Sequence, residues 1–222
     1  MDYKEASAWY NFTEKLGSKM GLEAVTILLS KLGNPQKMLR TIHITGTNGK
    51  GSTAATIASI LTSASYKVGL FTKPHLSTFR ESVVVNNQII PEDDAAKILS
   101  KIKKISEDMD LASNPRHPTQ FEVLTALAFI YFLEQQTEFA VVEAGMGGLL
   151  DATNVIDSLV AVITNVSLEH TGVLGKTKIE IAANKAGIIK QNSIIVTATR
   201  DDEVYSLLEK VSREKNSKIV RV

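Results

Sequence analysis

Short runs rich in valine, isoleucine and threonine alternate along this chain with longer segments whose apolar residues recur at helical spacing. Most of the short runs are continuously apolar, which indicates strands buried on both faces of a parallel sheet. Strands that alternate with helices in this way predict an α/β fold: a three-layer, mostly parallel sheet with helices on both faces. The predicted strands are residues 41–45, 67–72, 82–86, 139–143, 159–166, 193–198 and 218–222, and the predicted helices are residues 4–16, 21–32, 50–64, 93–108, 119–135, 178–189 and 202–214. The least regular segment, residues 106–120, is predicted to be a surface loop.

The composition of the chain excludes several kinds of function. Its 222 residues contain no cysteine, so disulfides, zinc–thiolate sites and a cysteine nucleophile are ruled out. The 25 basic and 24 acidic residues nearly cancel, which predicts no bulk attraction to nucleic acid or to an anionic membrane. No run approaches the ~18 apolar residues of a membrane span, and the N-terminal residues lack the apolar core of a signal peptide. We therefore expect a cytoplasmic protein whose partners are small molecules, with no nucleic-acid or membrane partner.

A glycine-rich loop joins the first predicted strand to the helix that follows it. Backbone N–H groups in such a turn form a concave, partly positive site for phosphate oxygens, because they lie at the N-terminus of a helix. Lys50 would add a positive charge, and Ser52 or Thr53 would add a hydroxyl group for Mg²⁺ or phosphate. The alternative is a glycine-rich turn with a solvated lysine, but the flanking strand and helix favour a phosphate-binding, P-loop-type site. Its predicted residues are Gly46, Thr47, Asn48, Gly49, Lys50, Gly51, Ser52 and Thr53.

Other polar residues follow the ends of predicted strands, where the ligands of open α/β sheets bind. Glu143 ends one strand and His170 follows the next, and a carboxylate and an imidazole there could ligate a divalent metal. Taken singly, however, Glu143 could be a surface strand end and His170 a loop histidine. A second glycine-rich turn, residues 143–154, carries Asp151 and is either a flexible surface loop or a loop that holds a second substrate. Lys185, on a predicted helix, would normally belong to a solvated face.

Taken together, these motifs resemble the folylpolyglutamate synthase and dihydrofolate synthase family of the Mur ligase superfamily. The variant loop is GTNGKGST at residues 46–53, in which Gly51 separates Lys50 from Ser52, unlike an ordinary phosphate loop. Matching stretches follow in the family's order along nearly the whole chain, at residues 72–76, 119–129, 141–155, 163–177 and 181–190. The resemblance implies a fold like the Mur ligase central domain. It also implies an ATP-dependent ligase that joins L-glutamate to folate, to dihydropteroate, or to both, through an acyl-phosphate intermediate.

The resemblance also implies roles for individual residues. Residues 46–53 would hold the triphosphate of ATP, and Lys185 matches the lysine that the family carbamylates with CO₂, which converts a cation into an anionic oxygen ligand. The implied ligands of two Mg²⁺ ions are Ser52, Glu143, His170 and Lys185. The implied catalytic residues are Lys50, His170 and Lys185, and those near the pterin are Thr119, Phe121 and Asp151.

The chain departs from the family pattern at three places. Lys73 stands where the family has a serine that ligates Mg²⁺, and a protonated lysine cannot ligate a metal. Either the metal loses a ligand, or the lysine contacts phosphate directly. Ser82 replaces an arginine, whose place Arg80 could take, and Leu149 stands where an arginine is common. These differences indicate a shifted substrate or a reduced catalytic competence.

Family members are longer than this chain and carry a C-terminal, Rossmann-like domain that supplies adenine contacts and much of the glutamate site. Residues 1–222 are therefore expected to be an ATP-binding domain that is incomplete at its C-terminal end. Alone it should have little ligase activity, and a complementary C-terminal half is a further expected partner. The alternatives are a non-catalytic or in-trans-completed Mg-ATP-binding module, a Mur-type ligase for another carboxylate, and a small-molecule phosphotransferase.

Overall fold

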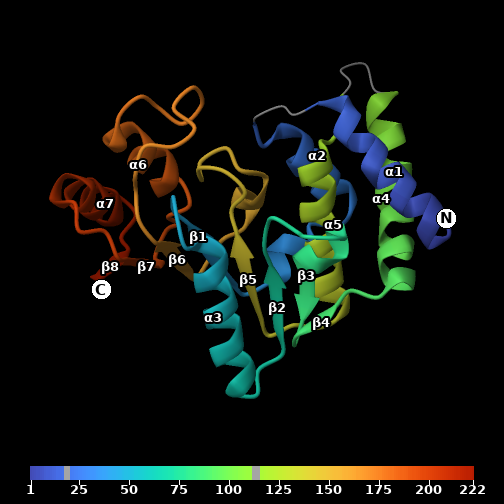
Figure 1. The fold of residues 1–222 in the computed structure, drawn as a ribbon, viewed down its shortest axis with the longest axis horizontal. Helices are drawn as coiled ribbons and strands as arrows, with labels where there is room; N and C mark the ends of the chain where they lie inside the picture. The colour runs from blue at the N-terminus through green and yellow to red at the C-terminus, as the bar shows by residue number, and fades with distance from the viewer. Residues whose placement is uncertain (18–20, 112–115) are drawn as a thin grey trace.

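A computed structural model describes residues 1–17, 21–111 and 116–222 of the chain. Within these residues the strands form one eight-stranded sheet in the order β4-β3-β2-β5-β1-β6-β7-β8 (Figure 1). Six neighbouring strands pair in parallel, in the order β2-β5-β1-β6-β7-β8. β3 pairs with β2, and β4 with β3, in antiparallel orientation. The strands are β1 (Thr41–Thr45), β2 (Val68–Phe71), β3 (Val83–Val85), β4 (Gln88–Ile89), β5 (Phe139–Glu143), β6 (Val160–Ile163), β7 (Ile194–Thr197) and β8 (Lys218–Arg221). The predicted mostly parallel α/β sheet is confirmed, and β4 is the strand that was not predicted.

Each predicted helix is present, with its ends shifted by a few residues. The α-helices are α1 (Tyr3–Thr13), α2 (Glu23–Lys31), α3 (Lys50–Ser63), α4 (Glu92–Asp110), α5 (Gln120–Glu134), α6 (Lys178–Ala186) and α7 (Asp202–Glu214), and short 3₁₀ turns are η1 (Glu14–Leu16), η2 (Pro35–Met38), η3 (Phe79–Ser82) and η4 (Ala152–Val155). None of these described helices is both long enough and apolar enough to cross a membrane.

The prediction of a surface loop over residues 106–120 is wrong at its start. Helix α4 continues to Asp110, because Met109 extends the buried apolar stripe of Ile98 and Ile102 at helical spacing. Part of the predicted loop, residues 112–115, lies outside the described residues.

Two apolar layers cover the sheet unequally. Side chains alternate along a strand, so Val141 of β5 packs on the side of α3 while Val142 packs in the larger core with α5. That larger core also holds α1, α2 and α4, and a separate cluster joins α6 and α7 to β6 and β7. Figure 1 shows α3 in front of the sheet, with α6 and α7 at the end opposite α1 and α4. The predicted three layers are therefore confirmed, although among the described helices α3 alone covers its face.

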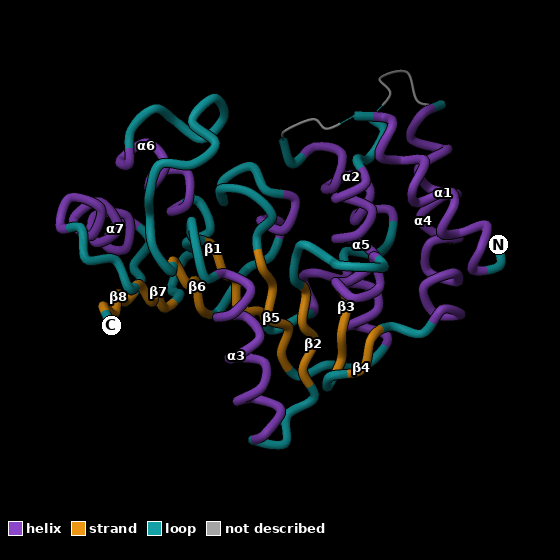
Figure 2. The backbone as a smooth tube through the Cα atoms, viewed as in Figure 1, coloured by secondary structure: helices purple, strands orange, loops and turns teal. Residues whose placement is uncertain are grey.

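The loops that carry the predicted site lie at a single edge of this sheet. Strands β1, β5 and β6 are neighbours and parallel, so their carboxyl ends meet at the same edge. Figure 2 shows the loops that follow these strands gathered there, with α3 beginning at the same level. Neighbouring parallel strands thus bring together segments that are far apart in the sequence.

Candidate functional site

The glycine-rich loop turns tightly from β1 into α3. Gly46 has a φ angle of 149°, and a Cβ atom there would lie 1.8 Å from Oγ1 of Thr164. Gly49 is the N-cap of α3, with a φ angle of 78°. The first N–H groups of a helix have no partner inside the helix, so the start of α3 presents free donors at the loop. This is the backbone arrangement that phosphate binding requires.

The loop is fastened to the segment that follows β6. Thr164 Oγ1 donates to the carbonyl oxygen of Asn48 over 2.7 Å, and Asn165 Nδ2 donates to the same oxygen over 3.0 Å. The N–H of Asn48 donates in return to Oδ1 of Asn165 over 3.1 Å. Thr164 and Asn165 were predicted to lie inside a strand, and their role in holding the loop was not predicted. β6 instead ends at Ile163, because these two polar residues turn toward the loop.

Lys50 holds its ammonium group over the loop. Its Nζ donates to the carbonyl oxygens of Gly46 over 3.0 Å and of Thr47 over 3.2 Å. Ser52 is exposed in the first turn of the same helix. The predicted phosphate-binding residues thus form one continuous loop and helix start, with a cation beside it.

Glu143 faces this loop from the end of β5. Its carboxylate is buried, accepts a hydrogen bond from the N–H of Lys73 over 3.2 Å, and lies 3.3 Å from where a Cβ atom of Gly51 would stand. Burial raises the pKa of Glu143, and the Lys73 N–H and the Lys50 charge act in the opposite direction. A carboxylate that accepts one protein hydrogen bond has lone pairs left for a metal ion at the loop.

Lys185 does not lie on a solvated face. Its side chain is fully buried, and its Nζ donates to Oε1 of Glu169 over 2.5 Å. The same oxygen also accepts from Thr47 Oγ1 over 3.3 Å, so the ion pair is tied to the phosphate loop. Burial lowers the pKa of Lys185, and Glu169 partly restores it. Glu169 was not predicted as a site residue, although it stands directly before His170, which was.

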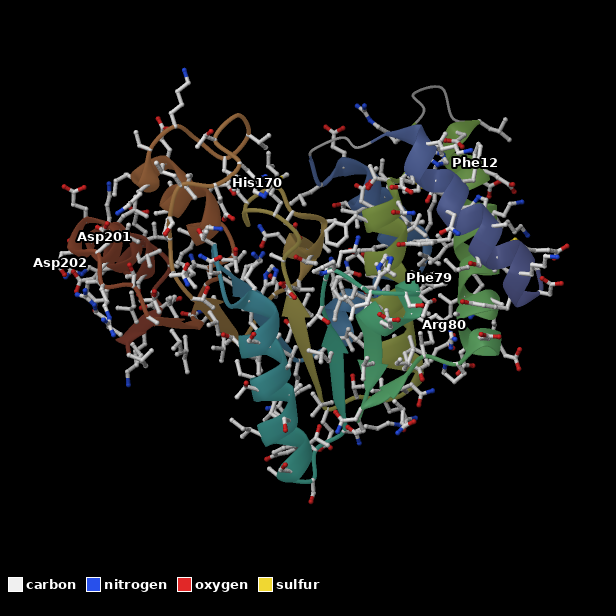
Figure 3. The ribbon with its side chains drawn as sticks, in the orientation of Figure 1. Phe12, Phe79, Arg80, His170, Asp201 and Asp202 are labelled. Carbon is white, nitrogen blue, oxygen red and sulfur yellow. The ribbon has the colours of Figure 1, made fainter. Side chains whose placement is uncertain are left out.

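His170 lies exposed on the loop after β6, with a φ angle of 43°. Figure 3 shows it on the side of the molecule where the loops gather, well apart from Phe79 and Arg80. Within the described residues, no three histidine, aspartate or glutamate side chains come together as a metal site. Two of the four predicted ligands, Ser52 and Lys185, are of other residue types, so the predicted sites do not require such a cluster. The two Mg²⁺ sites stay a prediction.

A separate cavity of about 290 Å³ lies beside the loop and brings together the three predicted acceptor residues. Thr119 is the N-cap of α5, where its Oγ1 accepts from the N–H of Glu122, and this cap places Phe121 in the first turn. The Phe121 ring stacks on Phe71 with ring centroids 6.1 Å apart. The cavity is lined by Gly21, Lys73, Thr119, Phe121, Glu122, Gly145, Met146, Leu150, Asp151 and Ala152.

Asp151 is held rigidly by a chain of hydrogen bonds. Its carboxylate accepts from the N–H of Met146 over 2.8 Å and from the hydroxyl of Thr153 over 2.5 Å. Thr153 Oγ1 in turn lies 2.8 Å from Nε2 of His43. Burial lowers the pKa of His43 to about 3, so the ring is neutral, and since Thr153 gives its proton to Asp151, we assign the proton of His43 to Nε2. Burial also raises the pKa of Asp151, against the effect of these donors.

The three departures from the family pattern have different structural consequences. The Lys73 ammonium lies 5.0 Å from the centroid of the Phe121 ring, in the cavity rather than over the phosphate loop. Arg80 pairs with Glu92 over 3.0 Å and lies over the ring of Tyr3, so it joins η3 to α4 and α1 instead of lining the cavity. Leu149 is 48% exposed.

Comparison with known proteins agrees with this geometry. Residues 44–222 match the model of the Mur ligase middle domain. A dihydrofolate synthase/folylpolyglutamate synthase of Bacillus subtilis is 41% identical over 207 residues, which are 93% of this chain and 48% of that protein. The folylpolyglutamate synthase structure from Thermotoga maritima is 42% identical, with a TM-score of 0.89, over 99% of this chain and 49% of that one. A folylpolyglutamate synthase solved with AMPPCP and folate is 34% identical, with a TM-score of 0.91, over 100% of this chain and 54% of that one.

The chain spans about half the length of the curated relatives it matches. The resemblance to folylpolyglutamate and dihydrofolate synthases, inferred from the order of the motifs, is confirmed. The chain thus belongs to the Mur ligase family, and along almost its whole length it is similar to the folylpolyglutamate and dihydrofolate synthases within that family.

Proposed function

We propose that this chain is the nucleotide- and acceptor-binding part of an ATP-dependent ligase that adds L-glutamate to folate, to dihydropteroate, or to both. The observation that carries this proposal is that the glycine-rich loop lies directly beside the cavity that contains Phe121 and Asp151. Lys73 connects the two: its backbone N–H donates to Glu143, which faces the loop, and its side chain lies over the ring of Phe121. A ligase of this kind must bring a phosphoryl donor next to an acceptor carboxylate. The relative solved with AMPPCP and folate binds such a pair on the same fold.

The phosphate loop supports binding of the ATP triphosphate. ATP supplies the phosphoryl group that makes the acceptor carboxylate reactive, since a free carboxylate is a poor acylating agent. Lys50 and the N–H groups at the start of α3 offset the negative charge of the phosphates. The carboxylate takes the terminal phosphoryl group of ATP, and ADP is released. The glutamate amine then attacks the activated carboxyl carbon and loses a proton, and phosphate leaves as the amide forms. Use of ATP requires a compartment that contains it, and the location we propose is the cytoplasm.

The surroundings of the loop fit a divalent cation. Glu143 offers a carboxylate with free lone pairs, and Ser52, His170 and a carbamylated Lys185 would complete the ligands. Carbamylation joins the neutral amine of Lys185 to CO₂ with loss of a proton, and the burial that lowers its pKa favours that neutral amine. The carbamate would stand beside the Glu169 carboxylate, so a nearby cation is needed to offset two negative charges. Mg²⁺ at this place would neutralise charge on the phosphates.

The test is ATP-dependent incorporation of labelled glutamate into folate and into dihydropteroate. It uses the chain alone and the chain mixed with the C-terminal half of the Bacillus subtilis relative, with Lys50→Ala as the inactive control. We expect incorporation in the mixture and little with the chain alone. Incorporation into one acceptor only would assign the substrate.

A second candidate function is a non-catalytic Mg-ATP-binding module, favoured by Lys73 in place of a metal-ligating serine. Its mark is Mg-ATP binding without glutamate transfer to any acceptor, even when the C-terminal half is supplied. That outcome would overturn the ligase proposal and leave the nucleotide site standing.

A further inference from the structure

Lys73 reaches two parts of the site with its two ends. Its backbone N–H donates to the carboxylate of Glu143, at the phosphate loop, over 3.2 Å. Its side chain turns the other way, so that Nζ lies over the ring of Phe121 at 5.0 Å from the centroid and lines the acceptor cavity. The residue therefore joins the two halves of the proposed site, and its charge belongs to the acceptor half.

The ammonium group of Lys73 has no hydrogen-bond acceptor among the described residues, in contrast to the two other lysines of the site. Lys50 donates to two loop carbonyls and Lys185 to Glu169, whereas the Lys73 ammonium has only the face of an aromatic ring. Burial lowers the pKa of Lys73, while the charges of Asp151 and Glu14 raise it. A half-buried cation whose N–H donors are unused gains from any ligand that brings an acceptor oxygen.

The other groups in the cavity narrow the kind of ligand. The Phe121 ring, stacked on Phe71, provides a rigid aromatic face, and Asp151 provides a carboxylate that is fixed by Thr153 and Met146. The Lys73 ammonium lies over the Phe121 ring, so a flat ligand that stacks there would take its place and leave the ammonium beside the ligand. An aromatic face with one anionic and one cationic group nearby suits a flat heterocycle that carries N–H donors next to a carbonyl oxygen. The pterin ring of folate has this pattern, because an N–H group and an amino group adjoin its ring carbonyl.

We propose that Lys73 is a specificity-determining residue for the acceptor. Its ammonium group donates a hydrogen bond to the carbonyl oxygen of the bound ring, and it rejects rings in which an amino group replaces that oxygen. This inference rests on the proposed function, since it takes folate as the acceptor. An amino group at that position is itself a donor and cannot accept a hydrogen bond from the ammonium group. The hydrogen bond is lost, and the half-buried ammonium stays unpaired. Without a ligand, the ammonium rests on the free face of Phe121.

The test compares folate with its analogue in which an amino group replaces the ring carbonyl. Both are titrated by fluorescence into the unmodified chain and into Lys73→Met, Lys73→Arg and Lys210→Met. Lys210 is an exposed lysine of α7 and serves as the control for loss of one positive charge. Thermal unfolding of each variant checks that it is folded, and calorimetric titration with Mg-ATP checks the phosphate loop.

We expect the unmodified chain to prefer folate about tenfold, the effect of one charge-assisted hydrogen bond. Lys73→Met should bind folate about tenfold more weakly and lose the preference. Lys73→Arg should keep most of it, and Lys210→Met should match the unmodified chain. Affinity for Mg-ATP should be the same in all four proteins.

Equal folate affinity in the unmodified chain and Lys73→Met would overturn the assignment and leave the proposed function intact. Loss of Mg-ATP affinity in Lys73→Met, with folate affinity unchanged, would place the ammonium at the phosphates instead. If the unmodified chain binds Mg-ATP but neither ring compound, folate is not the acceptor and this assignment fails. The proposed function then stands or falls on glutamate incorporation into dihydropteroate.

Discussion

At Gly46 the absence of a side chain decides whether the phosphate loop can form. The residue combines a φ angle of 149° with the close approach of Thr164, whose hydroxyl also holds the loop through the carbonyl oxygen of Asn48. A side chain would therefore have to displace the contact that shapes the loop. The glycine is required here by two independent constraints, the backbone angle and the available space.

The substitution Gly46→Ala should weaken nucleotide binding. The new methyl group would collide with Thr164, which costs about 1–3 kcal/mol of folding free energy and moves the loop. We expect Mg-ATP affinity, measured by calorimetric titration, to fall at least about tenfold, with a matching decrease in stability in urea. Gly172→Ala is the control, since a Cβ atom at Gly172 meets no atom within 4 Å. Unchanged Mg-ATP affinity in Gly46→Ala would contradict this account of the loop.

The buried ring of His43 predicts a dependence of stability on pH. Its pKa is about 3 in the folded chain and 6.5 when unperturbed, so below pH 6.5 the unfolded chain takes up a proton that the folded chain does not. The stabilisation that depends on a neutral His43 ring is therefore complete above pH 6.5. As the pH falls from 6.5 toward 3, the free energy of unfolding decreases by up to about 1.4 kcal/mol per pH unit.

Urea unfolding between pH 7 and pH 5 measures this slope. His43→Gln should be less stable at pH 7, because the hydrogen bond to Thr153 is altered, but it should lose this part of the pH dependence. The same slope in both proteins would show that another group titrates.

At the scale of elements, the start of α5 links helix stability to the acceptor cavity. Thr119 and Glu122 form a capping box, in which each side chain accepts from the backbone N–H of the other. Phe121 is in the first turn after the cap, so the same residues that begin the helix also place the aromatic face of the cavity. Thr177 and Glu180 form an equivalent capping box at the start of α6.

Thr119→Ala and Thr177→Ala separate these two roles. Loss of either cap should lower the free energy of unfolding by about 1 kcal/mol, measured in urea. Only Thr119→Ala should also weaken folate binding in a fluorescence titration, because only that cap lines the cavity. If both substitutions weaken folate binding equally, the effect is one of general stability and Thr119 is not part of the acceptor site.

At the scale of the whole molecule, the two faces of the sheet are covered differently. On the α3 side, Ile194 of β7 is 44% exposed and Val220 of β8 is 37% exposed, and no described helix covers them. We propose that the site is completed by a further domain, since the curated relatives are about twice as long as this chain. An exposed apolar strip on this face of the sheet is consistent with that proposal.

The mass of the native protein checks this proposal. We expect a species about twice as heavy as the 24.2 kDa of these residues, when the protein is isolated from its source cells with an antibody and weighed intact. A native species of 24.2 kDa would contradict it. The question would then become whether a separate protein supplies the rest of the site.

The amino-acid sequence by itself determined the strands, the helices and the glycine-rich turn between β1 and α3. These features depend on local properties: apolar periodicity, β-branched runs, and glycines at positions where a side chain cannot fit. The order of the loop, Glu143, Asp151 and Lys185 was also enough to indicate the family. β4 was not predicted because it has two residues, both exposed, and so lacks an apolar pattern.

Only the tertiary structure decided which charged side chains meet. Lys185 is buried against Glu169, 16 residues away, although its helix position alone predicted a solvated face. The buried bond between His43 and Thr153 spans 110 residues, and the ammonium of Lys73 faces the cavity lined by Phe121 rather than the glycine-rich loop. Such contacts depend on which strands become neighbours and on how loops pack at their ends. Local sequence periodicity contains no information about either, because both follow from the packing of the whole sheet.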